Sequence, residues 1–386
     1  MTKRRFGNYS RVRFKLEDPT MLKQYLGCTH VHHEGDLGKE VKVPGGWLPI
    51  PGYKEASKNK AAHKMKGIEY NMSAFIEQCV SAYLELAGLP VTKLSARAAT
   101  PFTDETNAFT TDEPEGKLTN IALKVLMKIL YAARYCRPDL LRATCALARR
   151  VSKWTTECDR RLHRLVSYMH LTAKYKQYAY VGDEFSRCTI ALFADADYAG
   201  DKTDSHSTSG VFIAIVGPHT YVPIVAVSKK QTCTSHSTCE SEVVALNVGL
   251  KAALPIMDLW EAIMPYFSPA KAGAAEMTKL EAAKIDPGSF AGGVPPNSAR
   301  LPGADDLDSP SPGQFSAELH IFEDNTSTIC VLEKGSSNKL AHLTRTHRVN
   351  LHWLSEVCAS QGVHVGHIGT DDQAGDIFTK ASTDPP

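Results

Sequence analysis

Two kinds of apolar periodicity divide the chain into a helical first part and a mixed second part. Between residues 71 and 87, and again between 120 and about 172, apolar positions recur at the spacing of amphipathic helices. The second block is interrupted at 137–139, where a proline can occupy the first turn of a new helix. Residues 18–32 predict a short helix followed by a strand. After Gly182 the pattern changes to short apolar runs, which predict strands.

The second part alternates strands with helices in an order that specifies one sheet. Strands are predicted at 188–194, 210–216, 221–228, 318–323 and 363–368. Helices are predicted at 238–267, with a kink at Pro255, and at 326–334, at 346–360 and from 371 onward. Three successive antiparallel strands followed by alternating helices and strands predict an α/β fold of the α+β kind. We expect a mixed five-stranded sheet flanked by helices, after a mostly helical region.

Length and composition predict the number of domains and the compartment but say little about function. A chain of 386 residues with 43% hydrophobic content is long enough for two or three domains with their own cores. The 44 Lys and Arg residues nearly balance 42 Asp and Glu, so any nucleic-acid binding depends on local basic patches. Ten cysteines without disulfide-like spacing, and no visible signal peptide or membrane-spanning run, predict an intracellular protein, cytoplasmic or nuclear, with no membrane partner.

Shifts in composition suggest where the parts of the chain begin and end. Residues 1–14 read as a basic arm, and 103–118 as a polar, acidic linker. Residues 268–316 are rich in Ala, Gly, Pro and Ser, which predicts a disordered insertion. The remaining parts are 15–102, 119–180 and 185–383, the last of which contains the insertion.

Four acidic residues of the second part are the candidates for chemistry. Asp195, Asp324 and Asp376 each lie at the end of a predicted strand or at the start of a predicted helix, and Glu242 lies in the long helix. Carboxylates that converge with no lysine to neutralise them attract a cation, and hard oxygen ligands select Mg²⁺ or Mn²⁺. Two such ions are the usual means of hydrolysing a phosphodiester. Because Glu240 and Glu242 point about 200° apart on a helix, only one can face the site, and we choose Glu242.

Short motifs follow one another after Gly182 and upstream of it. The later motifs are ADADYAGD, STSGVFIAI, SKKQ, HSTCESEVVAL, EDNTSTI, TRTHRVNLHWL and TDDQAGDIFTK. In this order they resemble the ribonuclease H domain of copia-type LTR-retrotransposon Pol polyproteins. FKLEDPTMLKQYLG, ILYAARYCRPDLLRATCALARR and RLVSYMHLT are similar to that family's reverse-transcriptase thumb and its connection to ribonuclease H. The paired-aspartate motif of the polymerase is absent, so the chain resembles a fragment without the palm.

The resemblance implies a function, a cofactor and partners. It implies hydrolysis of the RNA strand of RNA–DNA hybrids with two Mg²⁺ ions, for which Mn²⁺ can substitute. The four acids, Asp195, Glu242, Asp324 and Asp376, would be both the catalytic residues and the metal ligands. Phosphates would be met, without reading of sequence, by Lys229, Lys230, Arg345 and Arg348. The other implied partners are the missing palm or further polyprotein parts, and an active element would place the chain in a virus-like particle.

Several interpretations stay open. His367 is either an auxiliary proton carrier near the site or an ordinary surface histidine of a strand. The domain is either the enzyme, an inactive nucleic-acid-binding remnant, or a related nuclease or transposase of the ribonuclease H fold. The last would need another helix-borne acid after the fourth strand. Since acids clustered without metal repel one another, the presence of all four favours the enzyme. Cys233, His236 and Cys239 lack a fourth ligand at zinc spacing, which argues against a zinc site.

Overall fold

The computed structural model describes residues 21–35, 48–58, 65–103, 113–267 and 317–381. The basic arm, the insertion and most of the acidic linker therefore lie outside the described residues. Packing divides the chain into two compact units, residues 1–18 with 258–317 and residues 19–257 with 318–386. All described strands, and all described helices except the end of the longest one, belong to the second unit.

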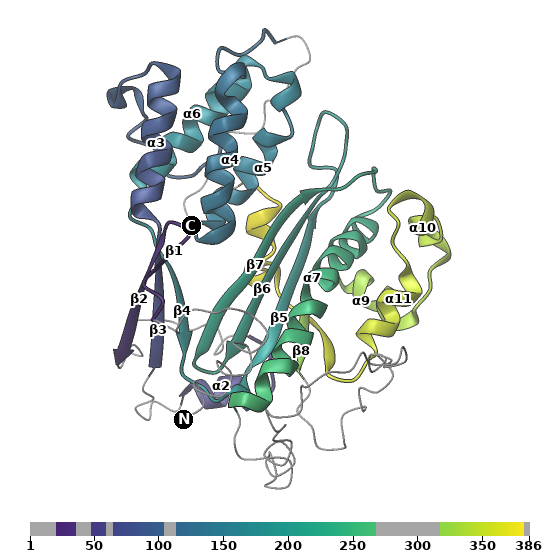
Figure 1. Cartoon of the computed structure of the whole chain (residues 1–386). Coiled ribbons are helices and arrows are strands. Elements are labelled where there is room, and N and C mark those ends of the chain that lie inside the picture. The colour runs from purple at the N-terminus through teal and green to yellow at the C-terminus, as the bar shows by residue number, and fades with distance from the viewer. Residues whose placement is uncertain (1–20, 36–47, 59–64, 104–112, 268–316, 382–386) are drawn as a thin grey trace, which may run out of the picture. The chain divides into compact units, whose positions relative to one another are not determined.

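One mixed sheet of nine strands runs through the second unit (Figure 1). The strands are β1 Gln24–Tyr25, β2 Cys28–Gly35, β3 Met65–Asn71, β4 Gln177–Val181, β5 Thr189–Asp197, β6 Thr208–Gly217, β7 Thr220–Lys230, β8 Leu319–Glu323 and β9 Val363–His367. Their order across the sheet is β1-β2-β3-β4-β7-β6-β5-β8-β9. Strands β5, β6 and β7 are antiparallel neighbours, whereas β8 runs parallel to both β5 and β9. All five strands predicted after Gly182 are present.

The prediction of a five-stranded sheet is wrong because four more strands extend the sheet beyond β7. Residues 24–35 form the hairpin β1–β2, so the predicted strand is present as β2, but β1 and a turn precede it where the helix was expected. Its turn places Leu26 and Gly27 at positive φ. In β3, Lys66 and Glu69 stand among apolar residues, so the strand has little apolar periodicity and its pairing with β2 and β4 decides the structure. The region before residue 181 is therefore helical and stranded, not mostly helical.

Four helices pack around one apolar core. They are α3 Ser73–Ala87, α4 Thr119–Tyr135, α5 Leu141–Ala148 and α6 Thr156–Leu171, and their core includes Tyr83, Leu126, Ile129, Leu162 and Met169. The predicted interruption is a 3₁₀ turn at Pro138–Leu140. Beside it the buried Arg137 guanidinium donates to Asp139 and to the carbonyl of Thr172, which ties the start of this turn to the end of α6. These bonds satisfy a buried charge that would otherwise be costly.

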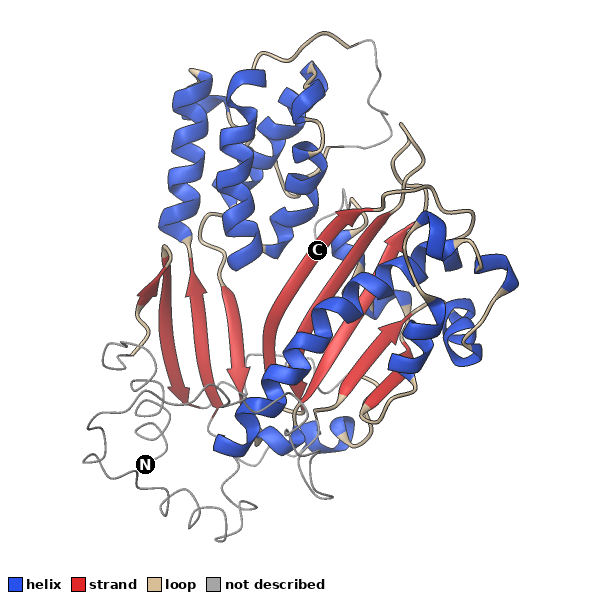
Figure 2. Ribbon diagram, turned by 45° about the vertical axis from the view of Figure 1, so that its right-hand side comes forward, coloured by secondary structure: helices blue, strands red, loops and turns tan. Residues whose placement is uncertain are grey.

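The long helix α7 spans Thr238–Phe267, and its part up to Met257 lies across one face of the sheet (Figure 2). It runs through Pro255 without a break in helical structure. A Cβ added at Gly249 would lie 2.8 Å from Leu192 Cδ1, so the glycine lets the helix approach β5 closely. The shorter helices are α2 Tyr53–Lys58, α9 Thr326–Lys334, α10 Leu343–Thr346 and α11 Leu351–Cys358. The predicted helix at 346–360 is thus confined to α11, and the predicted last helix is replaced by 3₁₀ turns at Thr370–Asp372 and Asp376–Phe378.

One part of α7 changes the expectation about membrane-spanning runs. Thr238–Ile263 is long and apolar enough to cross a membrane by length and composition alone. Core helices of water-soluble proteins meet the same criteria, and 56% of the most apolar stretch is buried inside the protein. Val243, Leu246 and Leu250 are fully buried. Packing within the protein therefore accounts for much of the apolar character of this helix.

The opposite face of the sheet has its own apolar cluster. Phe193 of β5 and Phe322 of β8 pair in register, and their rings stack with centroids 5.0 Å apart. Leu48, Ile50 and Tyr53 pack with them. Since side chains alternate across a strand, Leu192 and Ile321 face α7 while Phe193 and Phe322 face this second cluster.

Candidate metal-dependent active site

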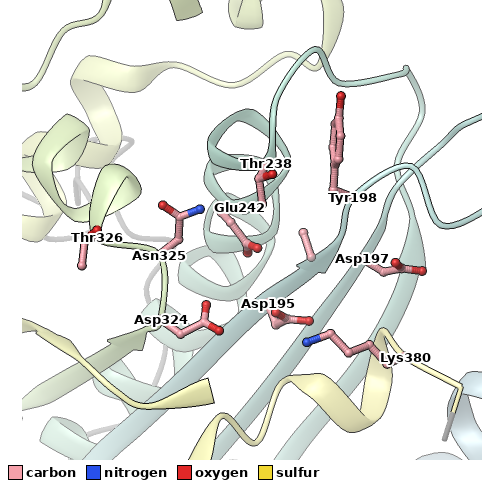
Figure 3. A pocket seen from close by; sticks show the side chains of 10 residues that line it. Asp195, Asp197, Tyr198, Thr238, Glu242, Asp324, Asn325, Thr326 and Lys380 are labelled. Carbon is pink, nitrogen blue, oxygen red and sulfur yellow. The ribbon is translucent and has the colours of Figure 1, made fainter. Parts of the chain in front are cut away.

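Three of the four predicted acids meet at one edge of the sheet (Figure 3). Asp195 lies near the end of β5, Asp324 directly follows β8, and Glu242 lies in the second turn of α7. Because β5 and β8 are parallel neighbours, both strands end at this edge of the sheet. One carboxylate oxygen of each residue lies within 4.8 Å of the corresponding oxygens of the other two. This spacing suits joint ligation of a cation.

The three acids line an open cavity of about 470 Å³. The cavity is also lined by Ala196, Asp197, Tyr198, Thr238, Asn325, Thr326 and Lys380 (Figure 3). Asn325 caps α9, since its side-chain oxygen accepts from the backbone N–H groups of Ser327 and Thr328. Thr370 Oγ1 donates to Asp324 Oδ2 at 3.1 Å. Capping of the helix and this hydrogen bond hold Asp324 toward the cavity.

Burial and mutual repulsion oppose the ionisation of two of these acids. Asp195 and Glu242 are 2% and 3% exposed. Burial raises the pKa of Asp195 to about 7, with the charge of Asp376 adding to the rise. Burial and the charges of Glu323, Asp195 and Asp324 raise the pKa of Glu242 to about 10. Glu242 Oε2 is buried without a hydrogen-bond partner among the described residues. A divalent cation would both supply that partner and offset the repulsion, so the donor set fits Mg²⁺ or Mn²⁺.

A fifth acid, Glu323, was not predicted, and its charge adds to the rise in the pKa of Glu242. It is fully buried, and burial raises its pKa to about 8. Its Oε1 accepts from the backbone N–H of Asn325 at 3.2 Å, and its Oε2 has no partner among the described residues. The sequence LHIFE carries a signal for it, because alternation puts Glu323 on the same strand face as Leu319 and Ile321. An acidic residue at a core-facing strand position, directly before a candidate ligand, should be counted among the candidate site residues.

Asp376, the fourth predicted acid, is not part of the three-acid cluster. It begins the last 3₁₀ turn, and its Oδ2 lies 2.7 Å from Lys380 Nζ. Lys380 also lines the cavity and extends toward Asp195 (Figure 3). The expectation that no lysine is present is therefore wrong. The spacing of four residues between Asp376 and Lys380 could have indicated the pair, because it brings two side chains together in a helical turn.

Close packing of two glycines brings this last segment to Asp195. Gly210 of β6 pairs with Asp195, and a Cβ added there would lie 2.5 Å from the carbonyl oxygen of Gly375. A Cβ on Gly375 would lie 2.9 Å from Asp195 Cβ. Gln373 Nε2 donates to the carbonyl groups of Ala194 and Phe322, which belong to β5 and β8. The segment is thus bonded to both strands that carry the acids.

A hydroxyl group from the same segment orients Asp195. Thr379 is fully buried, and its Oγ1 donates to Asp195 Oδ2. This hydrogen bond favours the charged form and so acts against the rise in the pKa of Asp195 that burial causes. Thr379 was not singled out from the sequence.

Glu240 faces away from the acids, as the helical phase predicted. Its Oε2 accepts from the backbone N–H of His236 at 2.8 Å, and its Oε1 lies 3.0 Å from His342 Nε2. His347 Nε2 lies 3.4 Å from the same oxygen. Glu240 therefore ties the start of α7 to α10, while Glu242 points into the cavity.

The four predicted phosphate-binding residues line a second cavity of about 740 Å³. They are Lys229, Lys230, Arg345 and Arg348, and Lys251 joins them. Lys230 Nζ lies 2.7 Å from Asp201 Oδ2 and 2.5 Å from Asp204 Oδ2, so its charge is already neutralised. Lys229, Arg345 and Arg348 are exposed. The cavity therefore has cationic groups able to meet an anion, although Lys230 is committed to the protein.

The remaining candidates are His367 and the group Cys233, His236 and Cys239, of which Cys233 lines the second cavity. His367 is the exposed last residue of β9, pairs in register with Glu323 and lines neither cavity. Its auxiliary role stays a prediction. Among the described residues, Cys233, His236 and Cys239 do not form a group with metal-ligand spacing. Cys233 Sγ instead donates to the carbonyl of Thr346 at 3.0 Å.

Comparisons with known proteins find distant and partial relatives. No family model matches the chain, and no solved structure matches it significantly. A secreted RxLR effector protein, number 161, of Plasmopara viticola is 30% identical over 135 residues, which cover 34% of this chain and 88% of that protein. The chain belongs to the same protein family as this Plasmopara relative.

A second protein to which the chain is similar is much longer than the chain. The retrovirus-related Pol polyprotein from transposon RE1 of Arabidopsis thaliana is 31% identical over 153 residues, which cover 40% of this chain. The matched segment spans only 9% of the polyprotein. The chain is thus distantly and partially similar to a copia-type Pol polyprotein, a class that carries enzymatic domains.

Proposed function

We propose that this chain hydrolyses the RNA strand of RNA–DNA hybrids with two Mg²⁺ ions, or with Mn²⁺ in their place. The observation that carries the proposal is the meeting of Asp195, Glu242 and Asp324 within 4.8 Å at one edge of the sheet. The buried, unpartnered Oε2 of Glu242 supports a cation at that point. Carboxylate clusters of this kind hold the metal ions of many nucleases.

The topology of the sheet supports a ribonuclease H fold for this part of the chain. Strands β7, β6, β5, β8 and β9 are neighbours in that order, with the first three antiparallel and the last three parallel. This arrangement agrees with what the motifs that resemble the copia-type ribonuclease H domain imply. The partial similarity to a Pol polyprotein points in the same direction.

The chain's own residues would position the ions and the substrate. Asp195, Glu242 and Asp324 would hold the ions, and the Thr379 hydroxyl group fixes the orientation of Asp195. Two bound Mg²⁺ ions supply an activated water and stabilise the departing 3′ oxygen. Lys380 lies at the cavity wall, where its ammonium group can meet a phosphate oxygen. The products would carry a 5′-phosphate and a 3′-hydroxyl group.

A polynucleotide would be held by the second cavity. Exposed cationic groups are offered by Lys229 of β7, by Arg345 of α10 and by Arg348, which follows α10. Such groups bind phosphates and fix the position of a duplex without reading its bases. Selection of RNA in a hybrid would depend on the A-like groove and the 2′-hydroxyl groups.

One observation favours the rival hypothesis of an inactive nucleic-acid-binding remnant. Asp376 is paired with Lys380 and stands outside the three-acid cluster. Its charge nevertheless raises the pKa of Asp195, and its Oδ1 is buried without a partner among the described residues, so an enzyme would need Asp376 to ligate an ion through this oxygen or to act without ligating one. A remnant would bind the hybrid through the basic cavity and leave it intact.

Cleavage of a labelled hybrid by the full chain separates the two hypotheses. We expect Mg²⁺-dependent cleavage of the RNA strand that EDTA abolishes and that Asp195→Asn reduces to background. Asp371→Asn is the matched control, because it is the same substitution at an exposed aspartate that lines neither cavity. Equal cleavage by the Asp195→Asn chain, or cleavage in EDTA, would contradict the proposal. Binding without cleavage would identify the remnant.

A further inference from the structure

A second group of potential metal ligands lies on β8 and β9. Glu318, His320 and His364 each offer one ligand atom, and these atoms lie within 4.8 Å of one another. His320 and His364 are directly opposite each other in the parallel pair β8–β9. Glu318 stands two residues before His320, so alternation puts it on the same face of the sheet. Two neighbouring strands thus bring two imidazoles and a carboxylate together.

This group is separate from the acidic site. His320 shares a sheet face with Phe322, opposite the face that α7 covers, and their rings stack. Glu318 precedes β8 whereas Asp324 follows it, which separates the two along the strand by roughly 20 Å. The donor sets also differ. The acidic site offers oxygen atoms, and the second group offers two ring nitrogens with one carboxylate.

Ring stacking positions the two histidines, and hydrogen bonds to β5 position the backbone of Glu318. Their ring centroids lie 4.6 Å apart with an interplanar angle of 28°. The backbone of Glu318 is fixed by its carbonyl oxygen, which accepts from Ile190 N at 2.8 Å and from Thr189 Oγ1 at 2.7 Å. Its side chain is 60% exposed and its Oε2 lies 3.9 Å from His320 Nε2, so the carboxylate can move to complete a site.

The state of His320 suits a ligand. Its side chain is 12% exposed, and its ring stacks on that of His364, so two imidazoles lie together. Imidazole nitrogens select Zn²⁺ and related transition metals, not Mg²⁺.

We propose that Glu318, His320 and His364 form a binding site for one transition-metal ion, with Zn²⁺ as the expected occupant. Two histidines and one glutamate form a known zinc donor set that leaves a fourth position open to water. A tetrahedral ion with bonds of about 2 Å requires ligand atoms roughly 3.3 Å apart. Glu318 Oε2 and His320 Nε2 lie 3.9 Å apart and all three ligand atoms lie within 4.8 Å, so the ligands must draw together slightly. Exposed Glu318 and His364 can make this movement without disturbing the core. The bound ion would join the edge strand β9 to β8.

The test is Zn²⁺ binding by the full chain after removal of metals with a chelator. Competition with a chromophoric chelator should reveal a site that His364→Ala weakens at least tenfold. His367→Ala is the matched control, because His367 is an exposed histidine of the same strand outside the group. Asp195→Asn should leave unchanged the affinity of the Zn²⁺ site that His364→Ala weakens, so this result does not depend on the proposed nuclease activity. Circular dichroism would check that each variant is folded.

A second readout identifies the ligands. Co²⁺ bound in place of Zn²⁺ should give the visible spectrum of a nitrogen and oxygen site, and Glu318→Gln should alter that spectrum. Equal Zn²⁺ affinity in the His364→Ala and unmodified chains would overturn the proposal. A spectrum with thiolate charge-transfer bands would also overturn it, because the ion would then sit at a cysteine such as the exposed Cys330.

Discussion

At the scale of single residues, the acidic site combines stabilising orientation with destabilising charge. Glu242 has three carboxylates near it and an oxygen atom without a hydrogen-bond partner in the described part of the chain. Without a cation this arrangement disfavours the folded state whenever the acids are charged. Residues selected only for stability would not be arranged in this way. The cluster is therefore better explained as a set of metal ligands, because binding of a cation offsets the repulsion between the carboxylates.

Glu242→Gln should stabilise the metal-free chain at neutral and alkaline pH. The raised pKa of Glu242 means that the folded state holds a proton more tightly than the unfolded state does. Stability from this residue is therefore present at acidic pH and is lost as pH rises from the ordinary glutamate value toward about 10. The variant should flatten this decline. Urea unfolding in EDTA between pH 5 and about 9 measures the effect.

The control for this prediction is Glu240→Gln. Glu240 is equally buried but is paired with His342 and His347, so its loss should cost about 1–3 kcal/mol. Added Mg²⁺ should raise the midpoint of unfolding in the unmodified and Glu240→Gln chains and should do so much less in Glu242→Gln. The same pH slope in Glu242→Gln and in the unmodified chain would show that this carboxylate is not the source of the repulsion.

Sequence patterns predicted some residues of the site and missed others for identifiable reasons. Helical phase showed that only one of Glu240 and Glu242 can face the site, because α7 is regular there, and the resemblance of the motif around Glu242 decided between them. Glu323 was missed because the neighbouring Asp324 was already taken as the candidate ligand at the end of this strand. The role of Lys380 depends on a terminal segment folded back onto β5, which no local pattern reveals.

At the scale of elements, the position of Asp195 depends on how closely the terminal segment approaches the sheet. The approach uses the missing side chains of Gly210 and Gly375 together with hydrogen bonds from Gln373. Arg142 of α5 adds a buried hydrogen bond from Nε to the carbonyl of Thr379 at 2.9 Å. The residue that orients Asp195 is thus held by a strand on one side and a helix on the other.

Gly210→Ala should destabilise the chain by roughly 1–3 kcal/mol, since overpacking against backbone atoms forces a shift. The added Cβ would lie 2.5 Å from the Gly375 carbonyl oxygen and 2.6 Å from Thr379 Cγ2. The shift should also weaken stabilisation by Mg²⁺, because Thr379 bonds to Asp195. Gly366→Ala in β9 is the matched control, since its Cβ would meet no atom within 4 Å. Chemical denaturation with and without Mg²⁺ measures both effects, and equal stability of the two variants would contradict the prediction.

Whole elements were predictable where one strong periodicity dominated them. The strands β5 to β9 and the helices α3, α7 and α9 have long apolar runs or clear helical spacing, and their bounds agree closely with those predicted. Strands β1 to β4 contain histidine, lysine, glutamate and tyrosine residues at many positions. Pairing with neighbouring strands decides their structure, and pairing is a tertiary property. The prediction of a last helix was wrong because contacts with β5 and β8 shape this short segment.

At the scale of the whole second unit, one sheet connects the region that resembles a reverse-transcriptase thumb with the candidate nuclease part. The junction between β4 and β7 has a single residue pair in register, Tyr180 with Tyr221. Further connection comes from the helical core, which takes up Phe378 of the terminal segment. This core therefore packs against the turn that carries Asp376. The succession of strands and helices along the later part was predicted from the sequence, but the continuation of its sheet into earlier strands was not, because nothing local marks β7 as an interior strand.

The nearly neutral chain should bind a hybrid through local charge, and the salt dependence of binding tests this. The net charge is +2, yet Lys229, Arg345 and Arg348 are exposed around one cavity. Arg345→Ala should lower the slope of log affinity against log salt concentration by about 1, with weakening that does not depend on sequence. Lys66→Ala on β3 is the control, because Lys66 is exposed but lies outside the cavity. Fluorescence anisotropy with a labelled hybrid in Ca²⁺ or EDTA measures binding without cleavage. An identical reduction in slope from both substitutions would mean that the hybrid responds to overall charge and not to this cavity.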